Sequence, residues 1–322
     1  MKEHSKYSSR LRIGSLVRLG AFLVGVASAA WLTGVCHNPC ASAQEAGGAS
    51  LAPPAHAAPG NPQALDNQPR VRQYNPLGRT GLQVSDISFG GGNISDPAVI
   101  EYALDRGINY FDTAESYGRN KSESAIGQVA ARRRSEMIIC TKFEMNERTT
   151  MEDMFTQLDG CLERLQTNYV DILMVHGGSS EALHNEAVYA AFDSLKKSGK
   201  IHFCGVSHHG PNISGELTPL IDAGKVDVIL CAYDPVADPG LPAMLAKARE
   251  KGIGLVAMKV ITSARKVELP EFTSGQYPFH IAALRWGLQT SGMDCMIPSL
   301  NMMDQVDEYL LASGAGRKAQ VK

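Results

Sequence analysis

The amino-acid sequence predicts an α/β protein folded as a (β/α)₈ barrel with eight parallel strands, and three observations predict it. Eight short apolar or β-branched runs recur between residues 84 and 311. The segments between these runs have helical periodicity. Charged and hydrogen-bonding side chains close or follow the runs, and active sites in this fold lie at the carboxyl ends of the strands. Such a barrel typically needs about 250 residues, which suits the chain.

The apolar runs are the predicted strands of the barrel. Strands in this fold are buried on both faces, so they are expected to be continuously apolar. The runs cover residues 84–89, 108–111, 137–141, 169–175, 201–206, 226–231, 254–258 and 294–298. A doubly wound open sheet is the main alternative, but no G-x-G-x-x-G opens a helix after any of these strands. The barrel is therefore favoured.

Helices are expected between the strands, and the clearest lies at residues 151–165. Its apolar stripe has i, i+3, i+4 spacing and consists of Met151, Met154, Phe155, Leu158, Cys161, Leu162 and Leu165. Ahead of the barrel, Gly78 and Gly81 lie in a short polar stretch at residues 74–81, which predicts a turn or hairpin covering the barrel bottom. Residues 261–276 are long and polar enough to form a variable lid or rim loop.

The N-terminal region has the layout of a secretory signal peptide at residues 1–43. Basic residues precede an uncharged run at residues 19–35, and Ala41-Ser42-Ala43 offers a cleavage site. The expected protein is exported to the periplasm. Because the uncharged run is longer than usual, an uncleaved membrane anchor is the alternative, and a membrane contact is expected through this segment alone. Residues 44–73 read as a flexible linker, which leaves residues 74–322 for the barrel.

Charge and cysteine content exclude two classes of protein. A net charge of -2 and a pI near 6.5 argue against a nucleic-acid binder, which needs a concentrated basic face. The cysteines beyond residue 43 are odd in number and scattered, so they do not predict a disulfide framework; they are Cys140, Cys161, Cys204, Cys231 and Cys295. Small buried thiols are expected instead, which is in tension with export to an oxidising compartment.

Four reactive residues lie at or just after the ends of three predicted strands. Asp112 and Lys142 each follow an apolar run directly, His176 closes a third run, and Tyr117 lies in the loop after Asp112. The carboxyl ends of parallel barrel strands meet at one rim, so the four side chains are expected to converge. The sequence therefore predicts an enzyme.

The motifs around these residues resemble the catalytic set of the aldo-keto reductases. The resemblance is carried by F-D-T-A-E-S-Y-G at residues 111–118, then by Thr141-Lys142 and Val175-His176. Residues 77–85 resemble the opening of the bacterial members, and residues 162–171 resemble the approach to the fourth strand. The similarity runs from about residue 74 to residue 311. It implies a (β/α)₈ barrel that reduces small aldehydes or ketones with a nicotinamide cofactor, NADPH usually and NADH as the alternative.

The resemblance also implies a role for each catalytic residue. Hydride delivery to a carbonyl carbon builds negative charge on the oxygen and needs a proton donor. Tyr117 would be that donor, and Lys142 would stabilise its phenolate, because a free phenol has a pKa near ~10. Asp112 would pair with Lys142, while His176 would hydrogen-bond the substrate oxygen.

Seven further positions match residues that would hold the cofactor, although several depart from the family pattern. They are Gly91, Ser207, His208, Lys259, Ser299, Gln305 and Glu308. His208 replaces the usual Asn, and Leu230 and Met258 stand where a Gln and an aromatic side chain are common. Ser299 and Gln305 replace the Lys and Arg that grip the 2′-phosphate of NADP, and without a guanidinium the preference for NADP weakens.

Two alternatives remain beside the reductase. The altered anchors and the apparent export favour a nucleotide-binding or regulatory barrel with little turnover. A metal-dependent hydrolase could use His176, His208, His209 and Asp112 as ligands. It is disfavoured because no paired His motif closes the first strand and no H-E-x-x-H occurs. No metal is therefore expected, while the substrate's identity and the oligomeric state are not predicted.

Overall fold

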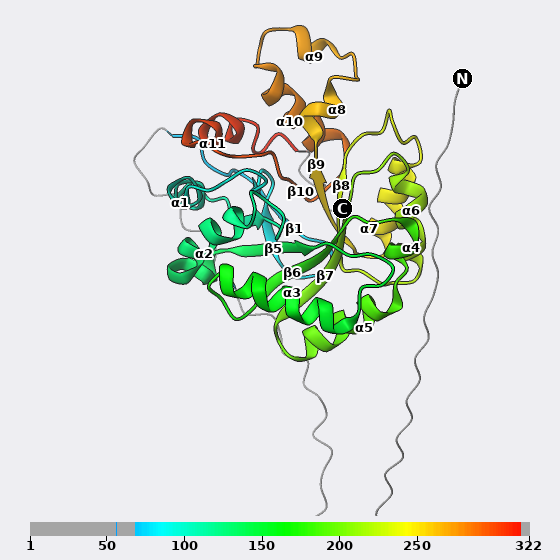
Figure 1. Ribbon diagram of the computed structural model, residues 1–322. Coiled ribbons are helices and arrows are strands. Elements are labelled where there is room, and N and C mark those ends of the chain that lie inside the picture. The colour runs from blue at the N-terminus through cyan, green and yellow to red at the C-terminus, as the bar shows by residue number, and fades with distance from the viewer. Residues whose placement is uncertain (1–55, 57–67, 317–322) are drawn as a thin grey trace, which may run out of the picture. The chain divides into compact units, whose positions relative to one another are not determined.

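The computed structural model describes residue 56 and residues 68–316, and these residues form a closed parallel barrel (Figure 1). Its eight strands are hydrogen-bonded in the order β10-β9-β8-β7-β6-β5-β4-β3. Parallel bridges from Ile87 to Met296 and from Gly90 to Ser299 close the ring. The strands are β3 (Phe89–Gly90), β4 (Tyr110–Asp112), β5 (Ile138–Phe143), β6 (Val170–His176), β7 (Ile201–His208), β8 (Val228–Ala232), β9 (Gly254–Met258) and β10 (Cys295–Met296). The predicted fold class is confirmed.

Helices surround the barrel and connect successive strands. The longer ones are α1 (Pro97–Asp105), α2 (Lys121–Arg133), α3 (Met151–Arg164), α5 (Glu186–Lys197), α6 (Ile213–Asp222), α7 (Leu241–Glu250), α10 (Phe279–Thr290) and α11 (Met303–Leu310). Shorter ones are α4 (Ser180–Leu183), α8 (Val260–Ala264), α9 (Pro270–Thr273) and the 3₁₀ turn η1 (Arg134–Glu136). The helix predicted at residues 151–165 is confirmed as α3, which begins with a capping box between Thr150 and Asp153.

The predicted hairpin precedes the barrel and contributes to its interior. Strands β1 (Tyr74–Pro76) and β2 (Gln83–Ser85) pair antiparallel. Val84 of β2, with Leu77 and Leu82 from the turn between the strands, belongs to the cluster of side chains inside the barrel. The strand predicted at residues 84–89 is wrong in its first half, because residues 84 and 85 belong to the hairpin. The chain changes direction at Asp86, whose buried carboxylate accepts hydrogen bonds from Ile87, Ser313 and Gly314.

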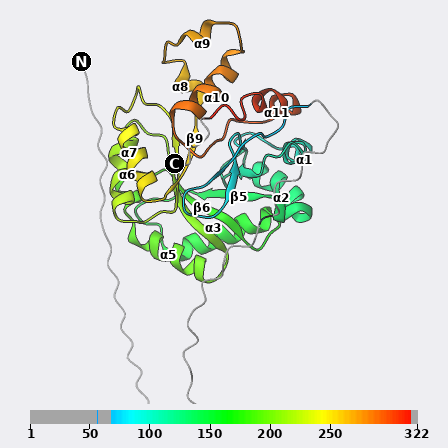
Figure 2. The same ribbon diagram turned by 180° about the vertical axis from the view of Figure 1, so that it is seen from behind.

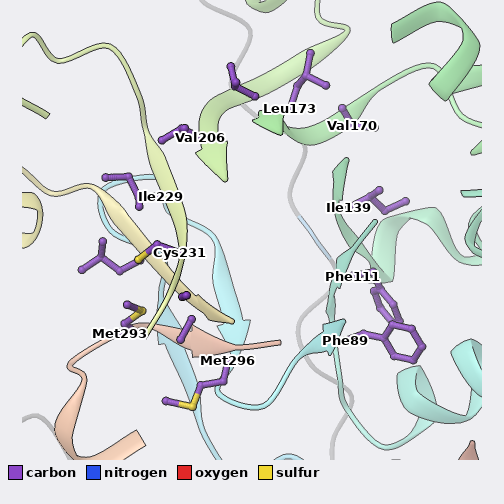
Figure 3. Packing of buried hydrophobic residues seen from close by; sticks show 14 of the residues in the cluster. Phe89, Phe111, Ile139, Val170, Leu173, Val206, Ile229, Cys231, Met293 and Met296 are labelled. Carbon is purple, nitrogen blue, oxygen red and sulfur yellow. The ribbon is translucent and has the colours of Figure 1, made fainter. Parts of the chain in front are cut away.

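Alternate strand residues fill two separate apolar layers. Residues on the outer face of the strands pack against the helices, and Figure 3 shows Phe89 beside Phe111 in this layer, with ring centroids 5.3 Å apart. Residues on the inner face fill the barrel and include Tyr110, Ile138, Cys140, Ile172, Met174, Val228, Leu230, Val256, Cys295 and Ile297. The period of two along a strand assigns each residue to one layer or the other.

The amino ends of the strands carry one arrangement that occurs four times. A side-chain oxygen at or just before the start of β4, β6, β8 or β10 accepts a backbone N–H from the preceding strand of the barrel or, for β4, from the last residue of β2. The pairs are Asn109 with Ser85 (2.8 Å), Asp171 with Ile139 (2.8 Å), Asp227 with Cys204 (3.1 Å) and Asp294 with Leu255 (2.8 Å). Each pair satisfies a backbone donor that the parallel ladder leaves unpaired at its edge.

Residues 70–73, which the sequence assigns to the linker, form hydrogen bonds to the barrel. Val71 N donates to Arg106 O, and Arg72 N donates to the Ser313 hydroxyl. Near this point α11 lies beside α1 in Figures 1 and 2, and the Tyr102 hydroxyl donates to Asp307 over 2.7 Å. The predicted signal peptide lies outside the described residues. Within the described ranges, no helix is long and apolar enough to span a membrane.

The cysteines of the described region are all buried and free, as predicted. Burial raises the pKa of the Cys140 and Cys231 thiols to about 12. These thiols therefore keep their protons at neutral pH and behave as small apolar side chains.

Candidate active site

The four predicted catalytic residues come from three neighbouring strands at the carboxyl rim. Asp112 is the last residue of β4, Lys142 lies near the end of β5, and His176 ends β6. Tyr117 lies in the loop after β4, which turns back because Tyr117 N donates to Ala114 O over 3.1 Å. The parallel register of these strands places the four side chains together.

Lys142 is the centre of the group. Its ammonium donates to Asp112 Oδ2 at 2.7 Å, to Thr113 O at 2.8 Å and to the Tyr117 hydroxyl at 3.4 Å. An ammonium has three N–H donors, so these partners account for all of them. The Lys142 side chain is fully buried and that of Asp112 is 2 % exposed, so the ion pair is shielded from water.

Burial and charge act against each other within this group. Burial raises the pKa of Asp112, and the Lys142 ammonium opposes that rise. Burial alone would lower the pKa of Lys142, but Asp112 and Tyr117 raise it above its usual value. Burial also raises the pKa of Tyr117, and Lys142 opposes that change. Lys142 therefore stays charged and favours the ionised form of the phenol beside it.

His176 lies next to Tyr117 and is neutral at neutral pH. The two rings meet edge to face, with centroids 5.5 Å apart and an interplanar angle of 82°. Burial, followed by the charges of Lys142 and His209, lowers the pKa of His176 to about 4. The imidazole Nδ1 lies 3.5 Å from the Ser116 hydroxyl. A neutral ring offers one donor and one acceptor for a polar group near the Tyr117 hydroxyl.

A cavity of about 410 Å³ opens at the rim beside Asp112 and Tyr117. Of the predicted cofactor residues, Lys259 and Ser299 line it. The full lining is Gly90, Gly92, Asp112, Tyr117, Ala257, Met258, Lys259, Val260, Ile261, Thr262, Leu284, Met296, Ile297, Pro298, Ser299 and Tyr309. Thr262 was missed because residues 261–276 were interpreted as a polar loop, and Val260 because it falls between that loop and the strand predicted at residues 254–258. Both belong to α8, which begins at the cavity.

The other predicted cofactor residues lie outside this lining. Gly91 packs against β4, where a Cβ would meet Asp112 O at 2.6 Å, and Ser207 is buried next to His176 in the register of β6 and β7. The remaining three have protein partners: His208 with Glu216 at 2.7 Å, Gln305 with the backbone N–H of Asn301 at 2.9 Å, and Glu308 with His280 at 2.8 Å.

The segment predicted as a lid extends from the barrel as α8 and α9, and α9 is drawn at the top of Figure 1. Phe272 of α9 packs against Phe279 and Trp286 of α10, with ring centroids 5.4 and 6.1 Å apart. Its role as a lid stays a prediction. Among the residues that the structure describes, no group of three or more His, Cys, Asp or Glu could hold a metal ion.

Comparisons with known proteins agree with this arrangement. Residues 92–266 match the family model of the aldo/keto reductases. L-galactose dehydrogenase from Arabidopsis thaliana is 30% identical over 281 residues, which cover 74% of this chain and 88% of that protein. An uncharacterised oxidoreductase of Bacillus subtilis is 25% identical over 258 residues, which cover 74% of this chain and 83% of that protein.

Solved structures share the fold. An aldo-keto reductase from Bacillus halodurans superposes with a TM-score of 0.64 at 23% identity, covering 78% of this chain and 93% of its own. An aldo-keto reductase from Klebsiella pneumoniae, solved with NADPH, gives a TM-score of 0.61 at 18% identity, covering 78% of this chain and 92% of its own. With the family model, the sequence relatives and the barrel in agreement, this chain belongs to the aldo/keto reductase family.

Proposed function

We propose that the protein is an NADPH-dependent carbonyl reductase that reduces small aldehydes or ketones, with Tyr117 as the proton donor. The observation that carries this proposal is the Lys142 ammonium, which donates both to Asp112 and to the Tyr117 hydroxyl at the edge of the cavity. NADPH is proposed because the Klebsiella pneumoniae reductase was solved with it. NADH is the alternative, since neither Ser299 nor Gln305 carries a positive charge.

The residues of the cavity suit a dinucleotide. Gly92 lines the cavity and has open space beside its Cα, since a Cβ there would meet nothing within 4 Å. Lys259 lies on the cavity edge, and within the described region its ammonium has no ion-pair partner, so it is available to a pyrophosphate. Ser299 and Tyr309 also line the cavity and carry hydroxyl groups. When bound, the nicotinamide would supply the hydride, and the protein would supply position and electrostatics.

The geometry of the chain's own residues supports this route for the proton. The neutral His176 would orient the substrate carbonyl oxygen toward Tyr117. As negative charge develops on that oxygen, the Tyr117 hydroxyl would donate its proton, and Lys142 would stabilise the phenolate that remains. Asp112 would keep Lys142 charged and aimed at the phenol. The buried position of the pair strengthens both interactions, because water does not screen them.

A titration of residues 44–322 with NADPH and NADH, followed by nucleotide fluorescence, tests the proposal together with turnover of a panel of small aldehydes. Binding, with turnover that is abolished in Tyr117→Phe while nucleotide affinity stays within about twofold, supports the reductase. Unchanged turnover in Tyr117→Phe would rule out the assigned proton donor. Glu152→Gln on the outer helix α3 is a control that should behave like the wild type.

A regulatory or nucleotide-binding barrel with little turnover is the second candidate. The observation in its favour is the His208–Glu216 pair, which engages the ring that replaces the usual carboxamide-binding Asn. Nucleotide binding without reduction of any carbonyl in the panel would select this candidate. The intact Asp112–Lys142–Tyr117 group favours the reductase.

We also propose that the protein is exported to the periplasm, on the strength of the signal-like layout of residues 1–43. Burial of the free thiols of Cys140, Cys161, Cys204, Cys231 and Cys295 is compatible with export, since buried thiols are protected from oxidation in such a compartment. Cell fractionation of the full chain tests this. Recovery of the uncut chain in the soluble cytosolic fraction would overturn it.

A further inference from the structure

The interior of the barrel below the active site contains polar groups that the proposed reaction does not use. The Tyr110 hydroxyl and Asp112 Oδ1 are both buried, and among the described residues neither has a partner of good hydrogen-bonding geometry. Tyr110 is 0% exposed and Asp112 is 1% exposed. Leaving such groups unpaired is costly, so two of them in one place require an explanation.

These two groups lie on one face of one strand. Tyr110 and Asp112 are two residues apart on β4, so both side chains point into the barrel. Asp112 uses Oδ2 for Lys142 at 2.7 Å, which leaves Oδ1 free for a second donor. A carboxylate in a buried ion pair needs such a donor, because its remaining lone pairs are otherwise unsatisfied.

The Cys140 thiol is placed to serve both groups. Cys140 is the register partner of Asp112 across β4 and β5, and it belongs to the same inner cluster as Tyr110. Burial, with the Asp112 carboxylate next in importance, raises the pKa of the thiol to about 12, so its sulfur carries a proton at neutral pH. A thiol can donate that proton and accept another through sulfur.

We propose that Tyr110 and Cys140 are positioning residues for the reaction: Tyr110 donates to the Cys140 sulfur, and the Cys140 thiol donates to Asp112 Oδ1. This chain of hydrogen bonds holds the carboxylate ionised and directed at Lys142. The inference rests on the proposed function for its kinetic consequence, but not for its geometry. It extends the Asp112–Lys142–Tyr117 group into the barrel interior.

Loss of these bonds shifts the proton that Lys142 and Asp112 share toward Asp112. Without a second donor, the Asp112 carboxylate becomes more basic and competes more strongly for that proton. Less positive charge then lies beside Tyr117, so the pKa of the phenol rises. The alkaline limb of the pH profile of kcat should move to higher pH by about one unit, and the turnover number near pH 7 should fall about tenfold.

Matched substitutions test this with little change in volume. Tyr110→Phe removes a hydroxyl alone, and Cys140→Ala and Cys140→Ser differ by one oxygen. The two deletions should both shift the alkaline limb, whereas Cys140→Ser should restore the wild-type profile, because a serine hydroxyl donates to a carboxylate. Cys231→Ala, which removes a buried thiol from the outer layer of the barrel, should leave the profile in place. A limb that does not move in Cys140→Ala, or that Cys140→Ser does not restore, would overturn the proposal.

An infrared measurement separates this proposal from the reductase assignment. The S–H stretching band of Cys140 is identified as the band lost in Cys140→Ala. In the wild type it should lie at the lower frequency of a bonded thiol, and Asp112→Asn should raise it, since an amide oxygen is a weaker acceptor than a carboxylate. A band unaffected by Asp112→Asn would refute the chain whether or not the protein reduces carbonyls. Absence of turnover in the wild type, with the expected band shift, would refute the reductase alone.

Discussion

Removal of Lys142 should cost both activity and stability, and the two losses can be separated. Lys142→Met keeps most of the side-chain volume and leaves the Asp112 carboxylate in a fully buried place without its 2.7 Å partner. Breaking one side of a buried pair typically costs about 3 to 5 kcal/mol, because a charge is left uncompensated. Turnover should fall about 10- to 1000-fold, since the phenolate of Tyr117 loses the cation that stabilises it.

The double variant Asp112→Asn/Lys142→Met makes the test quantitative. With both charges gone, most of the lost stability should return, and the coupling free energy between the two sites should exceed about 2 kcal/mol. Turnover should not return. Urea unfolding of the wild type, both single variants and the double variant provides the cycle, and aldehyde-dependent oxidation of the nucleotide provides the rates.

The pH dependence of Lys142→Met gives an independent check of the same reasoning. Burial already raises the folded-state pKa of Asp112 above its unfolded value, and without the ammonium that opposes this rise the pKa lies higher still. Its contribution to stability is therefore present below the unfolded pKa and is lost as pH rises through the folded pKa. The variant should be more stable at pH 5 than at pH 7. If Lys142→Met lowers the free energy of unfolding by less than about 1 kcal/mol and shows no such pH dependence, the Asp112–Lys142 pair is not a desolvated ion pair.

Three further predictions follow from particular residues. Burial raises the pKa of Asp294 to about 6, so its contribution to the free energy of unfolding should be present below about pH 4 and lost as pH rises through 6, and Asp294→Asn should flatten this part of the profile. Gly78→Ala should cost about 2 kcal/mol or more in urea unfolding, because φ is 51° and the new Cβ would lie 2.4 Å from Gly252 O. Gln305→Arg should tighten NADPH binding about tenfold and leave NADH binding unchanged in fluorescence titrations.

Each of these has an outcome that contradicts it. If the free energy of unfolding of Asp294→Asn changes between pH 4 and pH 6 as steeply as that of the wild type, another group is responsible for the titration. A Gly78→Ala variant with wild-type stability would show that the hairpin can move away from Gly252. An equal increase in affinity for NADPH and NADH in Gln305→Arg would show that the new guanidinium does not contact the 2′-phosphate.

The sequence predicts the barrel and the catalytic group well because each depends on local pattern. Asp112, Lys142 and His176 follow apolar runs directly, and parallel strands bring such ends together whatever the details of packing. Tyr117 is placed by a short turn that its motif already contains. The boundary of the first strand was not predictable in this way, because the chain breaks at Asp86 to bind residues near its far end.

Most features of the site that the sequence did not predict depend on tertiary packing. The pairing of His208 with Glu216 joins the end of β7 to α6, and no periodicity indicates which way that imidazole turns. The inward position of Tyr110 and Cys140 follows from the period of two along their strands, but their proximity to Asp112 depends on the register between β4 and β5. Register becomes visible only in the folded sheet.

The repeated side-chain-to-backbone hydrogen bonds at the amino ends of the strands join some neighbouring strands and not others. Asp171, Asp227 and Asp294 join β6 to β5, β8 to β7 and β10 to β9, whereas Asn109 joins β4 to the hairpin strand β2. Among the described residues, no bond of this kind joins β4 to β5. Asp112 lies on β4 and Lys142 on β5, so their ion pair joins two strands that these side-chain bonds leave unjoined. The catalytic pair thus also holds β4 against β5. Amide hydrogen exchange in both strands should become faster together when either Asp112 or Lys142 is removed.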